Sequence, residues 1–145
     1  MGDTAAREAW ACIVQQLRSD EHARRFAESA AVFDLTPTAQ KALLDLEPGG
    51  AKPMRDLAAK WFCDASNVTS LIDQLEQRGL VERRVPPNDR RVKAVSLTEQ
   101  GVSVRASLIE RLSAPPAGFA ALAAAEQRAL RDLLRKATAG LAPLK

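Results

Sequence analysis

Tyrosine is absent from this 145-residue chain, and aromatic residues of all kinds make up only 4% of it. Hydrophobic residues nevertheless account for 46%, so the core must be mainly aliphatic. Alanine and leucine dominate and are strong helix formers, and a chain of this length buries roughly 70% of its unfolded surface. The composition therefore predicts one helical domain, or two closely fused ones, with an aliphatic core.

Residues that build catalytic and metal sites are also scarce. There is one histidine, and neither of the two cysteines, Cys12 and Cys63, belongs to a Cys-x-x-Cys pair. Clustered carboxylates, a phosphate-binding glycine loop and a nucleophile motif are all missing. We therefore expect no enzyme activity, no metal site and no cofactor.

Long apolar runs are missing as well. No stretch approaches the roughly 18 apolar residues that a membrane span needs. The first residues lack a basic segment followed by an apolar one. We expect no membrane partner and a cytoplasmic location.

The most informative stretch that is present runs over residues 53–97. Its centre has apolar residues at the spacing of one buried helix face, namely Val68, Leu71, Ile72 and Leu75. The carboxylate of Asp64 is suited to cap this helix, and Gly79 is suited to end it in a left-handed conformation. The pattern predicts a helix over residues 64–78.

Further elements surround this helix. A shorter helix precedes it, with Pro53 suited to the first helical turn. Two valine-rich strands follow at residues 80–85 and 91–97, separated by a Pro-Pro-Asn-Asp turn. Two helices and a hairpin in this order predict a winged helix-turn-helix, a mainly α fold with a small β-hairpin wing.

The predicted hairpin carries the positive charge. Between residues 83 and 93, five cations face one anion, a net charge of +4, whereas the whole chain has +3. A cationic loop beside a polar helix suits double-stranded DNA. Arginines bind phosphates or a narrow minor groove, and amides and hydroxyls read base edges in the major groove.

The exposed face of the predicted helix is short and polar. Its candidate DNA-binding residues are Ser66, Asn67, Thr69, Ser70 and Gln74. The two amides pair well with adenine, whereas the three hydroxyls suit phosphates. Asp73 is expected to pair with a nearby arginine or to accept from a cytosine amino group. In an arbitrary helix these would be solvent-facing residues, but the second helix of a helix-turn-helix faces the groove.

These segments resemble the multiple antibiotic resistance regulator (MarR) family of bacterial transcription factors. The wing signature is Asp89-Arg90-Arg91 followed by Val-Ser-Leu-Thr-Glu-Gln-Gly at residues 95–101. Residues 75–83 resemble the family's exit from the recognition helix, and the similarity covers nearly the whole chain. The resemblance implies a dimeric DNA-binding repressor or activator, often released by a small apolar or phenolic effector.

The resemblance also assigns roles within the wing, residues 83–95. Its candidate DNA contacts are Arg84, Arg90, Arg91 and Lys93, with Asp89 holding Arg91 by a salt bridge while the guanidinium enters the minor groove. The alternative is a solvated charged turn.

Two positions depart from the family pattern, Phe62 and Ser70. Phe62 replaces a common glycine at the joint, so either the joint is not left-handed or a bulky residue is strained there. Ser70 replaces a common arginine or lysine, which shifts affinity towards the wing.

The helices predicted on either side are more apolar than the small winged unit can cover. They comprise one long helix or two in line over residues 5–31, a helix opened by Thr36-Pro37, and two helices after residue 98. We assign residues 1–34 and 99–145 to dimerisation helices and residues 35–98 to the DNA-binding domain. A homodimer reads two half-sites about 10 base pairs apart in a pseudo-palindromic operator.

Some questions stay open at this point. Trp10, Phe26 and Phe33 are either core residues or the wall of the effector cleft that the family has between dimer helices and winged domain. Some family members sense peroxide through an early cysteine, but the apolar neighbours of Cys12 argue against a stabilised thiolate, and Cys63 is expected to be buried. The other class of function is a winged-helix protein-interaction module. Salt dependence separates the two, because DNA binding releases counterions.

Overall fold

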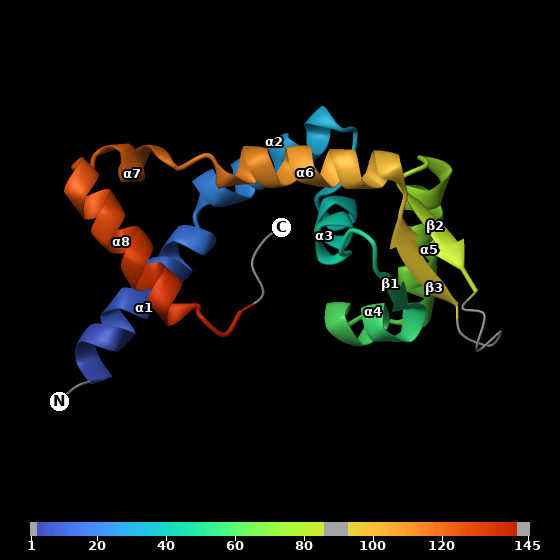
Figure 1. The fold of residues 1–145 in the computed structure, drawn as a ribbon, viewed down its shortest axis with the longest axis horizontal. Helices are drawn as coiled ribbons and strands as arrows, with labels where there is room; N and C mark the ends of the chain where they lie inside the picture. Colours follow the sequence, from blue (N-terminus) through green and yellow to red (C-terminus); the bar gives the residue numbers. More distant parts are fainter. Residues whose placement is uncertain (1–2, 86–92, 142–145) are drawn as a thin grey trace.

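The computed structural model describes residues 3–85 and 93–141. Helix α6 lies along the top of Figure 1 beside α2, with α1 and α8 at one end and the winged unit at the other. In chain order, the elements are α1 (Asp3–Leu17), α2 (Asp20–Val32), α3 (Pro37–Asp45), β1 (Ala51–Pro53), α4 (Met54–Trp61), α5 (Ala65–Gln77), β2 (Val81–Arg84), β3 (Ala94–Leu97), α6 (Glu99–Ser113), α7 (Ala117–Ala120) and α8 (Ala124–Ala137).

Local capping residues set several helix starts. Thr36 Oγ1 accepts from the amide of Ala39 at 3.1 Å at the start of α3, where a proline is the first helical residue. Thr98 Oγ1 accepts from the amide of Gly101 at 3.0 Å at the start of α6. Ser19 caps α2 in the same way, so the N-terminal helical stretch is two helices rather than one.

The start of α5 differs from the prediction in one respect. Asp64 is the N-cap residue, but its side chain accepts no hydrogen bond from the first turn. The amide of Asn67, in this first turn, donates instead to the backbone oxygen of Asp64 at 3.0 Å. The predicted end is confirmed, because Gly79 has φ +69° just after the helix.

The sheet has three antiparallel strands in the order β1-β3-β2. The hairpin strands β2 and β3 were predicted, with longer bounds, whereas β1 was not predicted. Pro53 is therefore the last residue of β1 and the N-cap of α4, not a residue of the first helical turn. A strand of three residues is too short to show the alternation of apolar and polar residues by which strands are recognised in a sequence. It exists because Lys52 pairs with Val95, a partner far along the chain.

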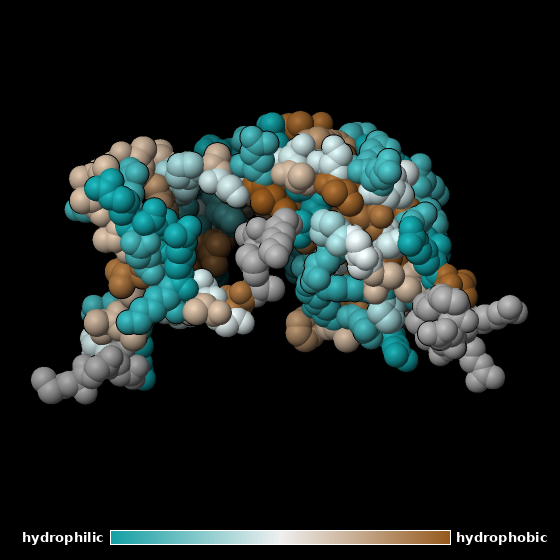
Figure 2. Space-filling model, viewed as in Figure 1, coloured by the Kyte–Doolittle hydropathy of each residue, from teal (hydrophilic) through white to brown (hydrophobic). Residues whose placement is uncertain are grey.

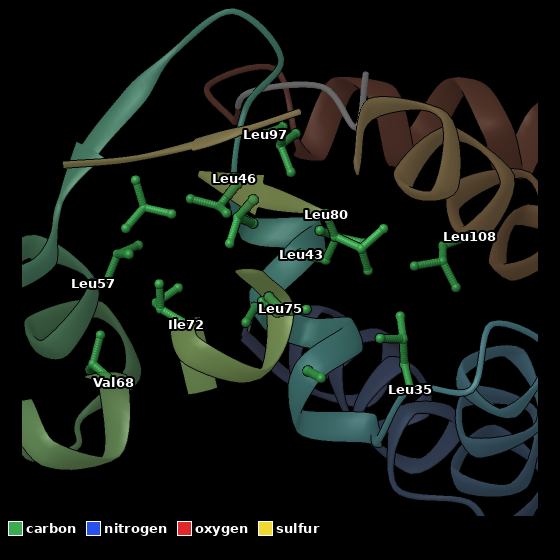
Figure 3. Close-up of a cluster of buried hydrophobic side chains, with 14 of the residues drawn as sticks. Leu35, Leu43, Leu46, Leu57, Val68, Ile72, Leu75, Leu80, Leu97 and Leu108 are labelled. Atoms are coloured by element: carbon green, nitrogen blue, oxygen red, sulfur yellow. The ribbon is translucent and has the colours of Figure 1, made fainter. Parts of the chain in front are cut away.

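The core lies between α3, α4, α5, the sheet and α6 (Figure 3). Three of the predicted apolar positions of α5 are buried, and the fourth, Leu71, is half-buried. Each fully buried aliphatic side chain stabilises the fold by about 1.5–3 kcal/mol. Fully buried hydrophobic residues include Leu43, Leu46, Leu57, Val68, Ile72, Leu75, Val95 and Leu108.

Two buried polar side chains fasten the winged unit to the flanking helices. Arg105 of α6, 5% exposed, donates from Nε and Nη2 to the carbonyl of Leu44 in α3, at 3.3 and 3.2 Å. Gln40 of α3 donates from Nε2 to the carbonyl of Phe26 in α2 at 3.0 Å. Because buried polar groups are costly without partners, these bonds fix how α2 and α6 sit on the winged unit.

The C-terminal part is much less buried than the winged unit. The last helix was predicted as one segment and is a short α7 followed by α8, and no described residue of either is buried. Apolar residues appear among hydrophilic ones on the surface of this end (Figure 2). None of the helices within residues 3–85 and 93–141 combines the length and the hydrophobicity that a membrane span requires.

Candidate nucleic-acid interface

Helix α4 is held against α3 by one carboxylate. Asp45 accepts from the indole Nε1 of Trp61 at 2.8 Å through Oδ2 and from Nζ of Lys60 at 2.9 Å through Oδ1. Leu57 from the same helix is fully buried. The position of α4, and so of the turn that follows it, is thereby set by the core and by Asp45.

The turn between α4 and α5 is left-handed. Phe62 has φ 49° and ψ 43°, which settles the alternative left open by the sequence in favour of a bulky residue in a conformation that suits glycine. This conformation costs roughly 1–2 kcal/mol for a residue with a Cβ atom. The ring is 97% exposed, so packing within the chain does not offset the strain.

The five candidate residues of α5 are all exposed. Their exposure follows from the burial of the opposite face of the helix, where Val68, Ile72 and Leu75 point into the core. The hydroxyl of Thr69 donates to the carbonyl of Ala65 at 2.9 Å, which leaves its oxygen free to accept. The helix therefore presents Ser66, Asn67, Thr69, Ser70 and Gln74 to solvent, as predicted.

Three of these side chains border a hollow that the sequence did not reveal. A cavity of about 500 Å³ is lined on one side by Asn67, Ser70 and Gln74 of α5. The first turns of α3 form the other side, with the exposed residues Thr38 and Lys41. The sequence indicated where α3 begins, through its Thr-Pro start, but not that α3 faces α5. The two sides of the hollow are about 30 positions apart in the chain. We call this surface the α3–α5 hollow; its lining residues are Thr36, Thr38, Lys41, Ala42, Trp61, Cys63, Asn67, Ser70, Leu71 and Gln74.

Arg83 connects the wing to α5. Its guanidinium donates to the carboxylates of Asp73 and Glu76, and its amide donates to Glu76 Oε1 at 3.2 Å. The hydrogen bond to Asp73, with the charge of both carboxylates, raises the pKa of Arg83. The prediction that Asp73 pairs with a nearby arginine is confirmed. These contacts hold strand β2 against α5.

Ion pairing reduces the positive charge that the hairpin offers to a partner. Arg84 is exposed and donates from Nε to Oε1 of Glu82 at 2.8 Å. The charge count over the hairpin missed Glu82 and the carboxylates of α5. Among the described wing residues, Lys93 is exposed and has no ion pair. Asp89, Arg90 and Arg91 lie outside the described residues.

The three aromatic residues considered for an effector pocket lie on the first two helices. Trp10 on α1 is 63% exposed. Phe26 on α2 is half-buried, with its ring centroid 6.3 Å from that of His22. Phe33, just after α2, packs against the core. Three cavities in the described part of the chain are lined by other residues, so an effector pocket at these aromatics stays a prediction.

The two cysteines differ in setting. Cys12 is exposed on α1, and Cys63 is half-buried at the turn before α5, where it packs against the core. Cys63 was expected to be buried. Its side chain is instead only half-buried, because it borders the α3–α5 hollow. Both are free thiols.

The two helices joined by a tight turn, followed by an antiparallel hairpin on the same core, define a winged-helix protein. A profile of the MarR family matches residues 35–93. SarZ, an HTH-type transcriptional regulator of Staphylococcus aureus, is 28% identical over 99 residues, which cover 68% of this chain and 67% of SarZ. The match assigns residues 35–93 to a domain of the MarR family of transcriptional regulators, and SarZ resembles a longer part of this chain.

Solved structures show the same fold. Wild-type MarR from E. coli without ligand is 26% identical, with a TM-score of 0.64 over 79% of this chain and 86% of that one. A cysteine-to-serine mutant of E. coli MarR complexed with operator DNA has a TM-score of 0.60 and 22% identity, over 94% of this chain and 95% of that one. The likeness extends beyond the matched residues 35–93 to the flanking helices.

Proposed function

We propose that the protein is a dimeric, sequence-specific DNA-binding repressor of transcription. Helix α5 enters the major groove, and the wing, residues 83–95, reaches the adjacent minor groove. A small apolar or phenolic effector releases the dimer from its operator. The observation that carries this proposal is the exposed polar face of α5, held outward by a buried apolar face and bordered by the α3–α5 hollow.

The chemistry of this surface supports DNA as the partner. Asn67 and Gln74 offer the amide groups that pair with adenine, and the neighbouring hydroxyls suit phosphates. Lys41 adds a cation on the far side of the hollow, where a phosphate backbone would pass. A structural neighbour with the same fold has been solved with operator DNA. A protein-interaction module has no comparable need for this combination of amides, hydroxyls and cations.

The surface of the flanking helices supports a homodimer. Leu133 on α8 is 66% exposed and Trp10 on α1 is 63% exposed. A further cavity of about 550 Å³ between α7 and α8 is lined mainly by apolar groups, including Phe119, Leu130 and Leu134. Exposed apolar surface of this kind marks an interaction site. A second copy of these helices would cover it.

Exchanging Leu133 for aspartate is expected to weaken the dimer at least tenfold. The exposed leucine contributes nothing to the core of one chain, but a charge buried between two copies has no partner. Sedimentation at a series of protein concentrations measures the shift from dimer to monomer. Ala59→Asp, an exposed position on α4, is the control and should leave the dimer intact. If Leu133→Asp dimerises as tightly as wild type, α8 does not form the interface at this position.

A direct link between α2 and α5 supports control by an effector. Arg78, at the end of α5, donates to the carbonyl oxygens of Phe33 and Asp34 at 2.8 and 2.5 Å and to Asp34 Oδ2 at 3.2 Å. Asp34 follows α2 and has φ 55°. A shift of α2 is therefore transmitted to α5. An effector that prefers a dimer with wrongly spaced α5 helices lowers operator affinity in proportion to that preference.

Selection of bound fragments from the source genome, followed by a salt titration, tests the proposed function. We expect a pseudo-palindromic fragment, and we expect log affinity to fall steeply with log salt concentration. A protein that binds no fragment at low ionic strength would refute DNA binding. It would leave the protein-interaction module as the function of this surface.

Arg91→Ala is expected to weaken operator binding by more than tenfold. Arg91 lies outside the described residues, and the prediction rests on the wing signature and on the attraction of a narrow minor groove for arginine. The slope of log affinity against log salt should fall by about one as well. Gel-shift titration measures both effects. Arg24→Ala, a solvent-exposed arginine on α2, is the matched control, and equal binding by Arg91→Ala and wild type would exclude the role.

A further inference from the structure

Phe62 is unfavourable in the folded chain for two independent reasons. Its backbone has φ 49°, a conformation that favours glycine, and its ring is 97% exposed to water. A glycine would remove the backbone strain, and a polar residue would remove the exposed apolar surface. Bulky residues held in such conformations concentrate at functional sites. The ring must therefore be explained by something outside this chain.

The position of Phe62 in the fold indicates which molecule outside the chain its ring contacts. It lies in the turn directly before α5, and both of its neighbours in sequence, Trp61 and Cys63, line the α3–α5 hollow. Asn67, four residues beyond Cys63, lines the same hollow. In a helix-turn-helix, the N-terminal part of the second helix contacts the base edges. The exposed ring therefore stands at the rim of the surface that meets DNA.

We propose that Phe62 is a further DNA-contacting residue and that its ring packs on thymine methyl groups at the edge of the major groove. This inference rests on the proposed function. The thymine methyl is the apolar group that base pairs present in the major groove, and phenylalanine is one of the side chains that contact it. Phosphates and polar base edges would not favour burial of an aromatic ring. The contact makes Phe62 a determinant of sequence preference.

Two substitutions separate the ring from the strain. Phe62→Ala removes the ring but keeps a Cβ atom in the left-handed turn, whereas Phe62→Gly removes both. We expect both variants to lose roughly tenfold in operator affinity, because they lose the burial of one large apolar side chain against DNA. Only Phe62→Gly should melt at a higher temperature than wild type, by about 3 °C. Because the ring carries no charge, the salt slope should not change.

Operators with uracil in place of thymine identify the contacted base. Removing one methyl group at a contacted position should weaken binding by wild type but not by Phe62→Ala. Gln77→Ala, at the exposed C-terminal end of α5, is the control and should bind like wild type. Equal operator affinity for Phe62→Ala and wild type overturns the inference, and so does an identical response of the two proteins to every uracil substitution. These outcomes differ from a failure of the proposed function, in which wild type itself binds no operator. That result would refute this inference as well.

Discussion

Replacing Gly101 with alanine is expected to lower the free energy of unfolding by about 3 kcal/mol. A Cβ atom at this position would lie 1.9 Å from the carbonyl oxygen of Leu80 and 3.3 Å from Cδ2 of Leu97. The first of these contacts is with backbone, so no change of rotamer relieves it. That same carbonyl accepts from the amide of Thr98 at 3.1 Å, which holds the start of α6 against the end of the α5–β2 connection. Alanine forces these segments apart.

Thermal unfolding followed by circular dichroism measures this effect. A loss of this size should lower the melting temperature by about 10 °C. Gly118→Ala is the matched control, because a Cβ atom at Gly118 meets nothing within 4 Å. It should leave stability unchanged or raise it slightly, since alanine restricts the unfolded chain. A Gly101→Ala variant that melts with wild type would show that α6 accommodates the methyl group by a small shift.

Features determined by neighbouring residues were predictable from the sequence. The Thr-Pro start of α3 and the left-handed Gly79 each depend on a few adjacent positions. The apolar spacing of α5 identified Val68, Ile72 and Leu75 as its buried face. Strand β1 depends instead on pairing with β3, more than 40 residues away, and no local signal announced it.

The exposure of the candidate DNA-binding residues of α5 was predictable for the same reason. Helical geometry alone placed the polar side chains of α5 on its exposed face. A count of charges along the hairpin, by contrast, treated Arg83 and Arg84 as available cations. Folding pairs Arg83 with two carboxylates of α5 and Arg84 with Glu82. The pairing gives Arg83 a positioning role, and Lys41 comes to line the same hollow as α5 only once α3 and α5 are packed together.

The double variant Asn67→Ala/Gln74→Ala is expected to lose a hundredfold or more in affinity for the operator. The two amides lie seven residues apart on α5, about 10 Å along its axis, so they reach different base pairs. A well-formed amide–adenine pair discriminates by roughly 1–3 kcal/mol, and sites this far apart are nearly additive. Both side chains are exposed, so their removal should leave the melting temperature unchanged.

The loss should fall on specific binding alone. Neither amide is charged, so binding to DNA of scrambled sequence, and its dependence on salt, should match wild type. Fluorescence anisotropy with operator and scrambled duplexes measures the ratio of the two affinities. Gln77→Ala, the same change at the exposed C-terminal end of α5, should leave that ratio intact. If the double variant still prefers the operator as strongly as wild type, base recognition does not come from these amides and must be assigned to the wing or to the shape of the DNA.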